Sequence, residues 1–124
     1  MVAFVTSRTL LVVEDDRPVR DLLVTVLRRA GFTVLAAATA EDALDLANEP
    51  IDLLLTDVML PGMSGPQLAR TIRAKSQSTQ IVFMSGYVGA HLNDEDMAQA
   101  AFLQKPFDAR TVVETLRAML EPRR

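Results

Sequence analysis

Residues 10–31 read LLVVEDDRPVRDLLVTVLRRAG, which is a run of apolar residues, a run of acids and then a longer segment of mixed polarity. The apolar run, Leu10-Leu11-Val12-Val13, has the length of a β-strand. Its lack of polar alternation is typical of a strand that is buried on both faces of a parallel sheet. The longer segment carries apolar residues three and four positions apart, which predicts an amphipathic helix. We therefore expect a buried strand, an acidic turn and a helix in succession.

The ends of this predicted helix are marked by its sequence. Asp16 is the expected N-cap, Pro18 suits the first turn, and Gly31 suits the position just past the last turn. Six apolar side chains are expected on the face that packs against the core: Val19, Leu22, Leu23, Val26, Leu27 and Ala30. The opposite face is expected to carry the polar side chains: Arg20, Asp21, Thr25, Arg28 and Arg29.

The same alternation continues along the chain. More apolar runs of strand length occupy residues 32–36, 51–56, 81–84 and 101–103. Helices are predicted at residues 39–48, 64–74 and 108–120, together with a short, loosely packed one within 89–100. Alternating strands and helices predict an α/β fold, here a five-stranded parallel sheet flanked by five helices in a doubly wound, flavodoxin-like order. We expect a single domain over 1–124, with a core at about 9–120 and terminal extensions at 1–8 and 121–124.

Composition excludes several functional classes. A chain of 124 residues with 49% hydrophobic and 23% charged residues is typical of one globular domain. The absence of cysteine excludes a disulfide framework, a thiolate metal site and a cysteine nucleophile. A net charge of -3 argues against a nucleic-acid partner, and no apolar run is long enough to cross a membrane. We expect a cytoplasmic protein, monomeric, without nucleic-acid or membrane contacts.

Acidic, hydroxyl and cationic side chains follow the ends of the predicted strands. Glu14-Asp15-Asp16 follows the first strand, Asp57 the third, Ser85 the fourth and Lys105 the fifth. Because the carboxyl ends of parallel strands meet at one edge, these groups are expected to lie together. Crowded carboxylates repel one another, and a hard divalent cation such as Mg²⁺ or Mn²⁺ would compensate. A carboxylate left free of the metal can attack a phosphoryl group and form an aspartyl phosphate.

Four motifs carry a resemblance to a known family: LVVEDD at 11–16, TDVMLPGMSG at 56–65, MSGY at 84–87 and LQKPF at 103–107. With them, residues 9–120 resemble the receiver domain of two-component response regulators. The last two motifs look most like the receivers of hybrid histidine kinases. The resemblance implies Mg²⁺-dependent transfer of a phosphoryl group from a histidine kinase or a histidine phosphotransfer protein, followed by a change of conformation. It implies no enzyme with a separate substrate, but a domain that catalyses its own phosphorylation and dephosphorylation.

The resemblance also implies roles for the residues around the phosphoryl group. Asp57 is implied to be the phosphoacceptor. Glu14 and Asp15 are implied to hold Mg²⁺ (or Mn²⁺) with Asp57 and the backbone carbonyl of Met59. The side chains of Met59 and Tyr87 are expected to control the access of water to the phosphoryl group. Because neither side chain offers a carboxylate or an amide to orient water, we expect slow self-dephosphorylation.

Further roles fall on the ends of the fourth and fifth strands. Ser85 and Lys105 are implied to bind the phosphoryl group, and the Lys105–Pro106 peptide bond is implied to be cis. Phe102 stands at the place of the family's switch aromatic. Phosphorylation is expected to draw Ser85 inward and let Phe102 turn into the space that opens.

Other classes fit parts of the pattern less well. A flavodoxin needs a phosphate loop rich in Ser, Thr or Gly where Glu14-Asp15-Asp16 stands. A phosphatase with an aspartate nucleophile carries Asp-x-Asp after its first strand, and a toprim-like enzyme carries it after the third, where position 59 is Met. The remaining alternative is an interaction module that signals without phosphate, against which the intact acids, Ser85 and Lys105 count. Without an output domain after residue 120, direct transcriptional control is not expected.

Overall fold

Strands and helices alternate along the residues that the computed structural model describes, which are 7–86, 92–98 and 100–121. The strands are β1 (Thr9–Val13), β2 (Thr33–Ala37), β3 (Leu53–Asp57), β4 (Gln80–Ser85) and β5 (Ala100–Gln104). The helices are α1 (Arg17–Arg29), α2 (Ala40–Leu46), α3 (Gly65–Lys75), α4 (Asp94–Ala98) and α5 (Ala109–Leu120). The order of elements is the predicted one.

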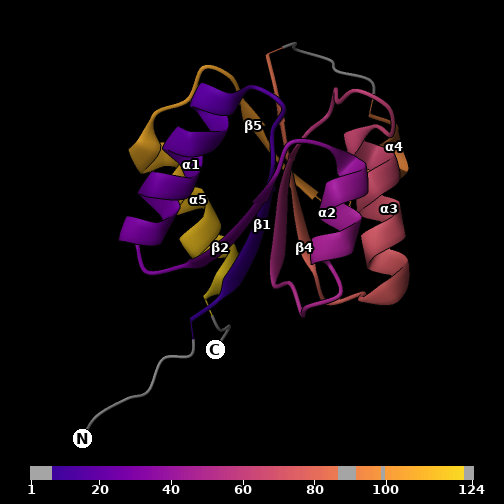
Figure 1. The fold of residues 1–124 in the computed structure, drawn as a ribbon, viewed down its shortest axis with the longest axis horizontal. Helices are drawn as coiled ribbons and strands as arrows, with labels where there is room; N and C mark the ends of the chain where they lie inside the picture. The colour runs from indigo at the N-terminus through magenta and orange to yellow at the C-terminus, as the bar shows by residue number, and fades with distance from the viewer. Residues whose placement is uncertain (1–6, 87–91, 99, 122–124) are drawn as a thin grey trace, which may run out of the picture.

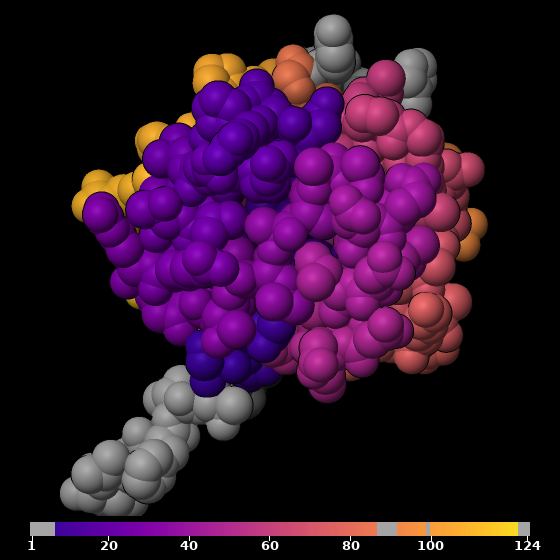
Figure 2. Space-filling view, in the orientation of Figure 1, coloured from indigo at the N-terminus to yellow at the C-terminus, as the bar shows by residue number. Residues whose placement is uncertain are grey.

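The five strands form one parallel sheet in the order β2-β1-β3-β4-β5. Helices α1 and α5 cover one face of the sheet, and α2, α3 and α4 cover the other (Figure 1). Figure 2 shows that side chains from α1 and α2 form much of the surface on the side where β2 is the edge strand. The predicted doubly wound α/β fold is confirmed.

The core consists of two apolar layers, one on each face of the sheet. Because successive strand residues point to opposite faces, Leu10 and Val12 of β1 pack with α1 and α5, whereas Leu11 and Val13 pack with α2 and α3. Leu54 and Leu55 of β3 divide between the layers in the same way, and β3 is buried along its whole length. Strand β3, which ends at Asp57, therefore cannot shift without disturbing both apolar layers.

Four helices begin at a side chain that caps them. The side-chain oxygens of Asp16, Thr39, Ser64 and Asp108 accept hydrogen bonds from backbone N–H groups in the first turns of α1, α2, α3 and α5. The bond from the Thr111 N–H lowers the pKa of the Asp108 carboxyl. Asp16 was expected in this capping role, in contrast to Glu14 and Asp15, which were expected to bind a cation. Gly31, just beyond α1, has a φ of 101°, a conformation that favours glycine.

The packing of α1 differs from the prediction at two positions. Leu22 was expected to face the core, but it is 59% exposed, and burial is concentrated at Leu23 and Leu27. Arg20 was expected to face solvent, but it is half-buried and its side chain turns back over the end of β1. The buried face of α1 thus includes Val24 in place of Leu22.

Helix α4 is short, as its lack of an apolar stripe predicted. It has five residues and none of them is buried. Asn93 Oδ1 accepts a hydrogen bond from Asp96 N at 2.8 Å, and Leu92 just before the helix packs against the core. Residues 89–91 and 99 of the predicted segment lie outside the described residues, as does Tyr87.

The described end of the amino-terminal extension contacts the edge of the sheet. Ser7 Oγ donates a hydrogen bond to the Gly31 carbonyl at 3.0 Å, and the Arg8 carbonyl accepts one from Thr33 N at 2.9 Å. Both residues are exposed. None of the described helices is both long enough and apolar enough to span a membrane.

Candidate functional site

The strand register brings the polar ends of four strands to one edge of the sheet. Val13 pairs with Thr56, so the next residues, Glu14 and Asp57, leave neighbouring strands at the same level. Asp57 in turn pairs with Met84, which places Ser85 one step beyond it. The hydrogen bond from Lys105 N to the Ser85 carbonyl, at 2.8 Å, fixes the end of β5 beside the end of β4.

Lys105 lies between two buried carboxylates. Its Nζ is 2.9 Å from Glu14 Oε1 and 2.9 Å from Asp57 Oδ1. Glu14 is 1% exposed and Asp57 is 6% exposed, so both charges are largely removed from water. The Lys105–Pro106 peptide bond is cis, as the resemblance implies. The single ammonium group is thus shared by the two acids and partly compensates their repulsion.

The pKa of the Asp57 carboxyl is raised above 3.8 because burial disfavours its charged form. The hydrogen bond and the positive charge of Lys105 act in the opposite direction but do not cancel the effect of burial. A carboxylate that is poorly solvated retains its nucleophilic character, because no water shell must be removed before it reacts. The fold therefore holds the ionised Asp57 carboxylate at some cost in stability.

Three carboxylates at this edge fit a divalent cation. One oxygen each from Glu14, Asp15 and Asp57 lies within 4.8 Å of the others, the one such group of potential ligands among the described residues. Within the described chain, Glu14 Oε2 is the buried side-chain atom that has no hydrogen-bond partner, so it is available to a ligand. Asp15 is exposed and opens the group to solvent. A set of oxygen ligands suits a hard cation such as Mg²⁺, so the three predicted carboxylate ligands are consistent with the geometry.

The backbone around Asp57 is held from behind by residues that sequence reasoning did not single out. The buried Thr56 hydroxyl donates a hydrogen bond to the Asp57 carbonyl at 3.0 Å. Gly65, the first residue of α3, lies so close that a Cβ there would collide with the same carbonyl oxygen. Gly65 N also donates to Val58 O at 3.0 Å. Close packing against the backbone of Asp57 therefore explains why the last residue of the TDVMLPGMSG motif, Gly65, is a glycine.

Arg20, which was predicted to face solvent, contacts the backbone of the site. Its Nη1 donates a hydrogen bond to the backbone carbonyl of Glu14 at 2.8 Å. The sequence signal was its position, six residues after Glu14, in the first turn of a helix that starts directly beyond the acidic turn. An Arg side chain is long enough to reach back across such a turn.

The remaining predicted site residues lie at different depths. Met59, two residues beyond Asp57, is 60% exposed. Phe102 is half-buried and packs against the apolar layer formed with α2 and α3. Ser85 is buried at 3% exposure. Tyr87, the other residue expected to control water access, lies outside the described residues.

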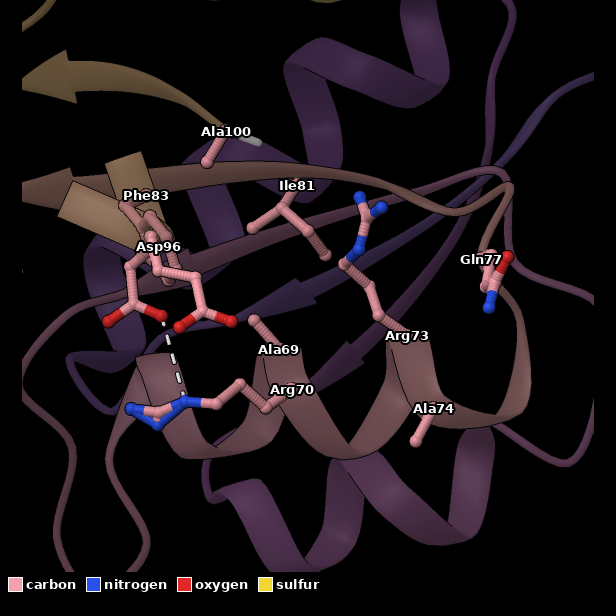
Figure 3. Close-up of a pocket in the computed structure, with 10 residues that line it drawn as sticks. Ala69, Arg70, Arg73, Ala74, Gln77, Ile81, Phe83, Asp96 and Ala100 are labelled. Carbon is pink, nitrogen blue, oxygen red and sulfur yellow. Dashed lines mark ion pairs between the residues drawn. The ribbon is translucent and has the colours of Figure 1, made fainter. Parts of the chain in front are cut away.

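A separate cavity lies away from the acidic edge, between α3 and α4 (Figure 3). Its volume is about 420 Å³, and Ile81 and Phe83 of β4 form part of its lining. Arg70 Nε of α3 lies 3.6 Å from Asp96 Oδ1 of α4, and this ion pair joins the two helices across the cavity. None of the predicted site residues that the structure describes lines it.

Comparisons with known proteins agree with the geometry. The family of response regulator receiver domains matches residues 10–117. The sensor kinase CckA of Brucella abortus is 36% identical over 120 residues, which cover 93% of this chain but 13% of the kinase. The response regulator receiver protein CpdR of the same organism is 35% identical over 116 residues, which cover 91% of this chain and 97% of CpdR.

Solved structures share the fold. The receiver domain of the hybrid histidine kinase CckA superposes with a TM-score of 0.79 at 35% identity, covering 91% of this chain and 99% of that one. The response regulator TrrA of Thermotoga maritima, solved in complex with Mg²⁺-BeF, gives a TM-score of 0.81 at 27% identity, with coverage of 91% and 99%.

The chain belongs to the response regulator receiver domain family. It has the family's phosphoacceptor role in two-component signalling, as the sequence predicted, rather than that of a module that signals without phosphate.

Proposed function

We propose that Asp57 is the phosphoacceptor and that the donor is a phosphohistidine on a histidine kinase or a histidine phosphotransfer protein. In this reaction a carboxylate oxygen of Asp57 bonds to phosphorus, the phosphorus–nitrogen bond breaks, and the imidazole leaves with the electron pair and takes up a proton. The observation that carries the proposal is the position of Asp57, which is buried, contacts Lys105 Nζ at 2.9 Å and lies in the three-carboxylate group.

The neighbours of Asp57 have separate roles in the proposal. Lys105 neutralises charge on the phosphoryl oxygens, and it is already held at the site by Glu14. The Ser85 hydroxyl donates a hydrogen bond to the phosphoryl group. Glu14, Asp15, Asp57 and the Met59 carbonyl hold Mg²⁺, which supplies further charge neutralisation when bound.

The switch is proposed to run from Ser85 to Phe102. A phosphoryl group adds a charge of roughly -1.5 to -2 and acceptor oxygens that attract the Ser85 hydroxyl. Ser85 and Phe102 lie on the neighbouring strands β4 and β5. Phe102 pairs with Phe83, and Phe83 precedes Ser85 by two residues on β4. Because Phe102 is half-buried, it has room to change its packing, and its lack of a hydroxyl leaves the response to packing alone.

Slow self-dephosphorylation is part of the same proposal. Hydrolysis needs a water molecule in line with the bond between phosphorus and Asp57. Met59 follows Asp57 by two residues and offers no group that would orient such a water. The chain is proposed to act as a cytoplasmic monomer that binds neither nucleic acid nor membrane, with its negative net charge of -3 in support of the first point.

The mass of the intact protein after incubation with acetyl phosphate tests this function. With Mg²⁺, the wild type is expected to gain one phosphoryl group, and Asp57→Asn is expected to gain none. The control is Asp52→Asn, which changes an acid at the other end of β3 that contacts Thr9 N at 2.7 Å. Equal mass gain in the wild type and in Asp57→Asn would refute the assignment, and no gain under any condition would favour a phosphate-independent module.

A further inference from the structure

Arg20 contacts both ends of the acidic turn that follows β1. Its Nη1 donates to the Glu14 carbonyl at 2.8 Å, and its backbone N–H donates to the Asp16 carbonyl at 2.9 Å. The turn between these carbonyls contains Asp15, which is exposed and has no buried packing to hold it. One residue of α1 therefore spans the segment that carries two of the three carboxylates of the candidate metal group.

The contact with the Glu14 carbonyl completes the restraint of that residue. On the other side of Glu14, its N–H donates to the Ala37 carbonyl of β2 at 3.1 Å. The bond to Ala37 holds the peptide plane before Glu14 and the bond from Arg20 holds the plane after it, so the backbone dihedral angles of Glu14 have little freedom. A charged donor also makes a stronger hydrogen bond than a neutral one. Arg20 therefore restrains the backbone from which the Glu14 and Asp15 side chains project.

Arg20 has two opposite effects on a cation at this site. Its positive charge repels the cation, so its removal should strengthen binding on electrostatic grounds. Its hydrogen bond orders the turn before the cation arrives, so its removal should weaken binding. We propose that the second effect dominates and that Arg20 is a positioning residue, which holds Glu14 and Asp15 in the arrangement that binds a divalent cation. This inference rests on the proposed metal-dependent function.

Because the two effects have opposite signs, one variant distinguishes them. Arg20→Met removes the donor and the charge but keeps much of the apolar stem. Arg17→Met is the matched control, since Arg17 lies in the same turn of α1, is exposed, and pairs with Asp21 of its own helix at 3.6 Å. Both variants lose one positive charge near the acids. Arg20→Lys keeps the charge and one donor and is expected to restore part of the effect.

The readout is the dissociation constant of Mg²⁺, from backbone amide shifts of residues 14–16, with thermal unfolding to confirm folding. Arg20→Met is expected to bind Mg²⁺ roughly 10-fold more weakly than the wild type, the scale seen when a residue that orients a metal ligand is removed. Arg17→Met is expected to bind within about 2-fold of the wild type, since an exposed charge is screened by salt. Arg20→Lys is expected to fall between them.

A second measurement needs no metal. ¹⁵N relaxation of the Asp15 and Asp16 amides in the metal-free protein should show greater motion in Arg20→Met and unchanged motion in Arg17→Met. Unchanged motion together with equal or tighter Mg²⁺ binding in Arg20→Met would overturn the inference. If the wild type itself fails to bind Mg²⁺, the metal part of the proposed function fails, and the relaxation data still decide whether Arg20 orders the turn. Should Arg20→Met not fold, Arg20→Lys decides: it must show intermediate motion and affinity.

Discussion

Helices α1 and α4 both follow strands that end at the acidic edge, yet they are held in very different ways. Helix α1 has 13 residues and two buried leucines, and its Arg20 is bonded to the backbone of the site. Helix α4 has five residues, none of them buried, and the Arg70–Asp96 ion pair joins it to α3 across a cavity. Both helices lie on the same sheet, but only α1 buries side chains against it.

The helix beside the acids, α1, is firmly packed, whereas α4 is the helix that can move most easily. Local unfolding has its lowest free energy where few apolar contacts are buried, and this describes α4 and not α1. On the β1 side, the Glu14 carboxylate is buried and is held by Lys105. We expect a change at Ser85 to move α4 more readily than α1, because no residue of α4 is buried.

Among the variants that test this difference, Lys105→Met is expected to lower the free energy of unfolding most. It leaves the buried Glu14 and Asp57 carboxylates without their shared cation, and breaking a buried ion pair usually costs about 3 kcal/mol or more. The free energy of unfolding of the metal-free protein, from urea titration, should fall by about 3 kcal/mol. A loss no greater than that in Arg110→Met, which breaks an exposed pair on α5, would show that the acidic edge is not the tightly held region.

The next effect is expected from Gly65→Ala. The added Cβ meets the Asp57 backbone carbonyl, so α3 or the end of β3 must shift. We expect a loss of about 2 kcal/mol in stability, in the range of overpacked cores, and slower phosphorylation by acetyl phosphate because Asp57 is displaced. The control is Gly86→Ala, where a Cβ meets no described atom within 4 Å. Normal phosphorylation of Gly65→Ala would contradict the role of close packing behind Asp57.

A smaller effect of opposite sign is expected from Asp57→Asn. Burial raises the pKa of Asp57 above 3.8, so in the folded state its ionised form is disfavoured. The contribution of Asp57 to stability is complete below pH 3.8 and is lost as the pH rises through the higher pKa of the folded state.

The metal-free Asp57→Asn protein should therefore be more stable than the wild type at pH 7, by about 1 kcal/mol, the usual scale of a single substitution. The advantage should shrink as the pH is lowered toward 4. Urea titrations of both proteins at several pH values test this. A difference that does not change with pH would mean that the Asp57 carboxyl is not destabilised by burial.

The smallest global effect is expected from Arg70→Gln. Arg70 is about half exposed, and exposed ion pairs contribute little, so the free energy of unfolding should fall by about 0.5 kcal/mol. The Asp96 side chain is only 8% exposed in the pair, and the loosely held α4 can move outward to hydrate it. Hydrogen exchange of the α4 amides should accelerate while that of the α1 amides stays the same. Equal acceleration in both helices would remove the contrast between them.

The fold was predictable because its signals are local. Apolar runs mark the strands, and Asp16, Thr39, Ser64 and Asp108 mark the starts of four helices within the described residues. The meeting of Glu14, Asp57, Ser85 and Lys105 was also predictable, because in a parallel sheet the carboxyl ends of the strands share one edge.

What could not be predicted depends on contacts between residues that no local pattern joins. Leu22 fits the apolar stripe of α1, yet it is exposed because the sheet beneath is covered by Val24 and its neighbours. Arg20 fits the polar stripe, yet its side chain is long enough to reach the Glu14 carbonyl. The need for Gly65 arises from the approach of α3 to Asp57, which only the three-dimensional arrangement reveals.

The most direct test of the central claim is to locate the phosphorylated residue chemically. Borohydride reduces an aspartyl phosphate to homoserine and releases phosphate, so the site is recorded in the sequence of a peptide. After phosphorylation in the presence of Mg²⁺, reduction and proteolysis, tandem mass spectrometry should find homoserine at position 57 and not at position 15 or 16. Homoserine at another aspartate, or phosphorylated protein that yields none, would contradict the assignment of Asp57 as the phosphoacceptor.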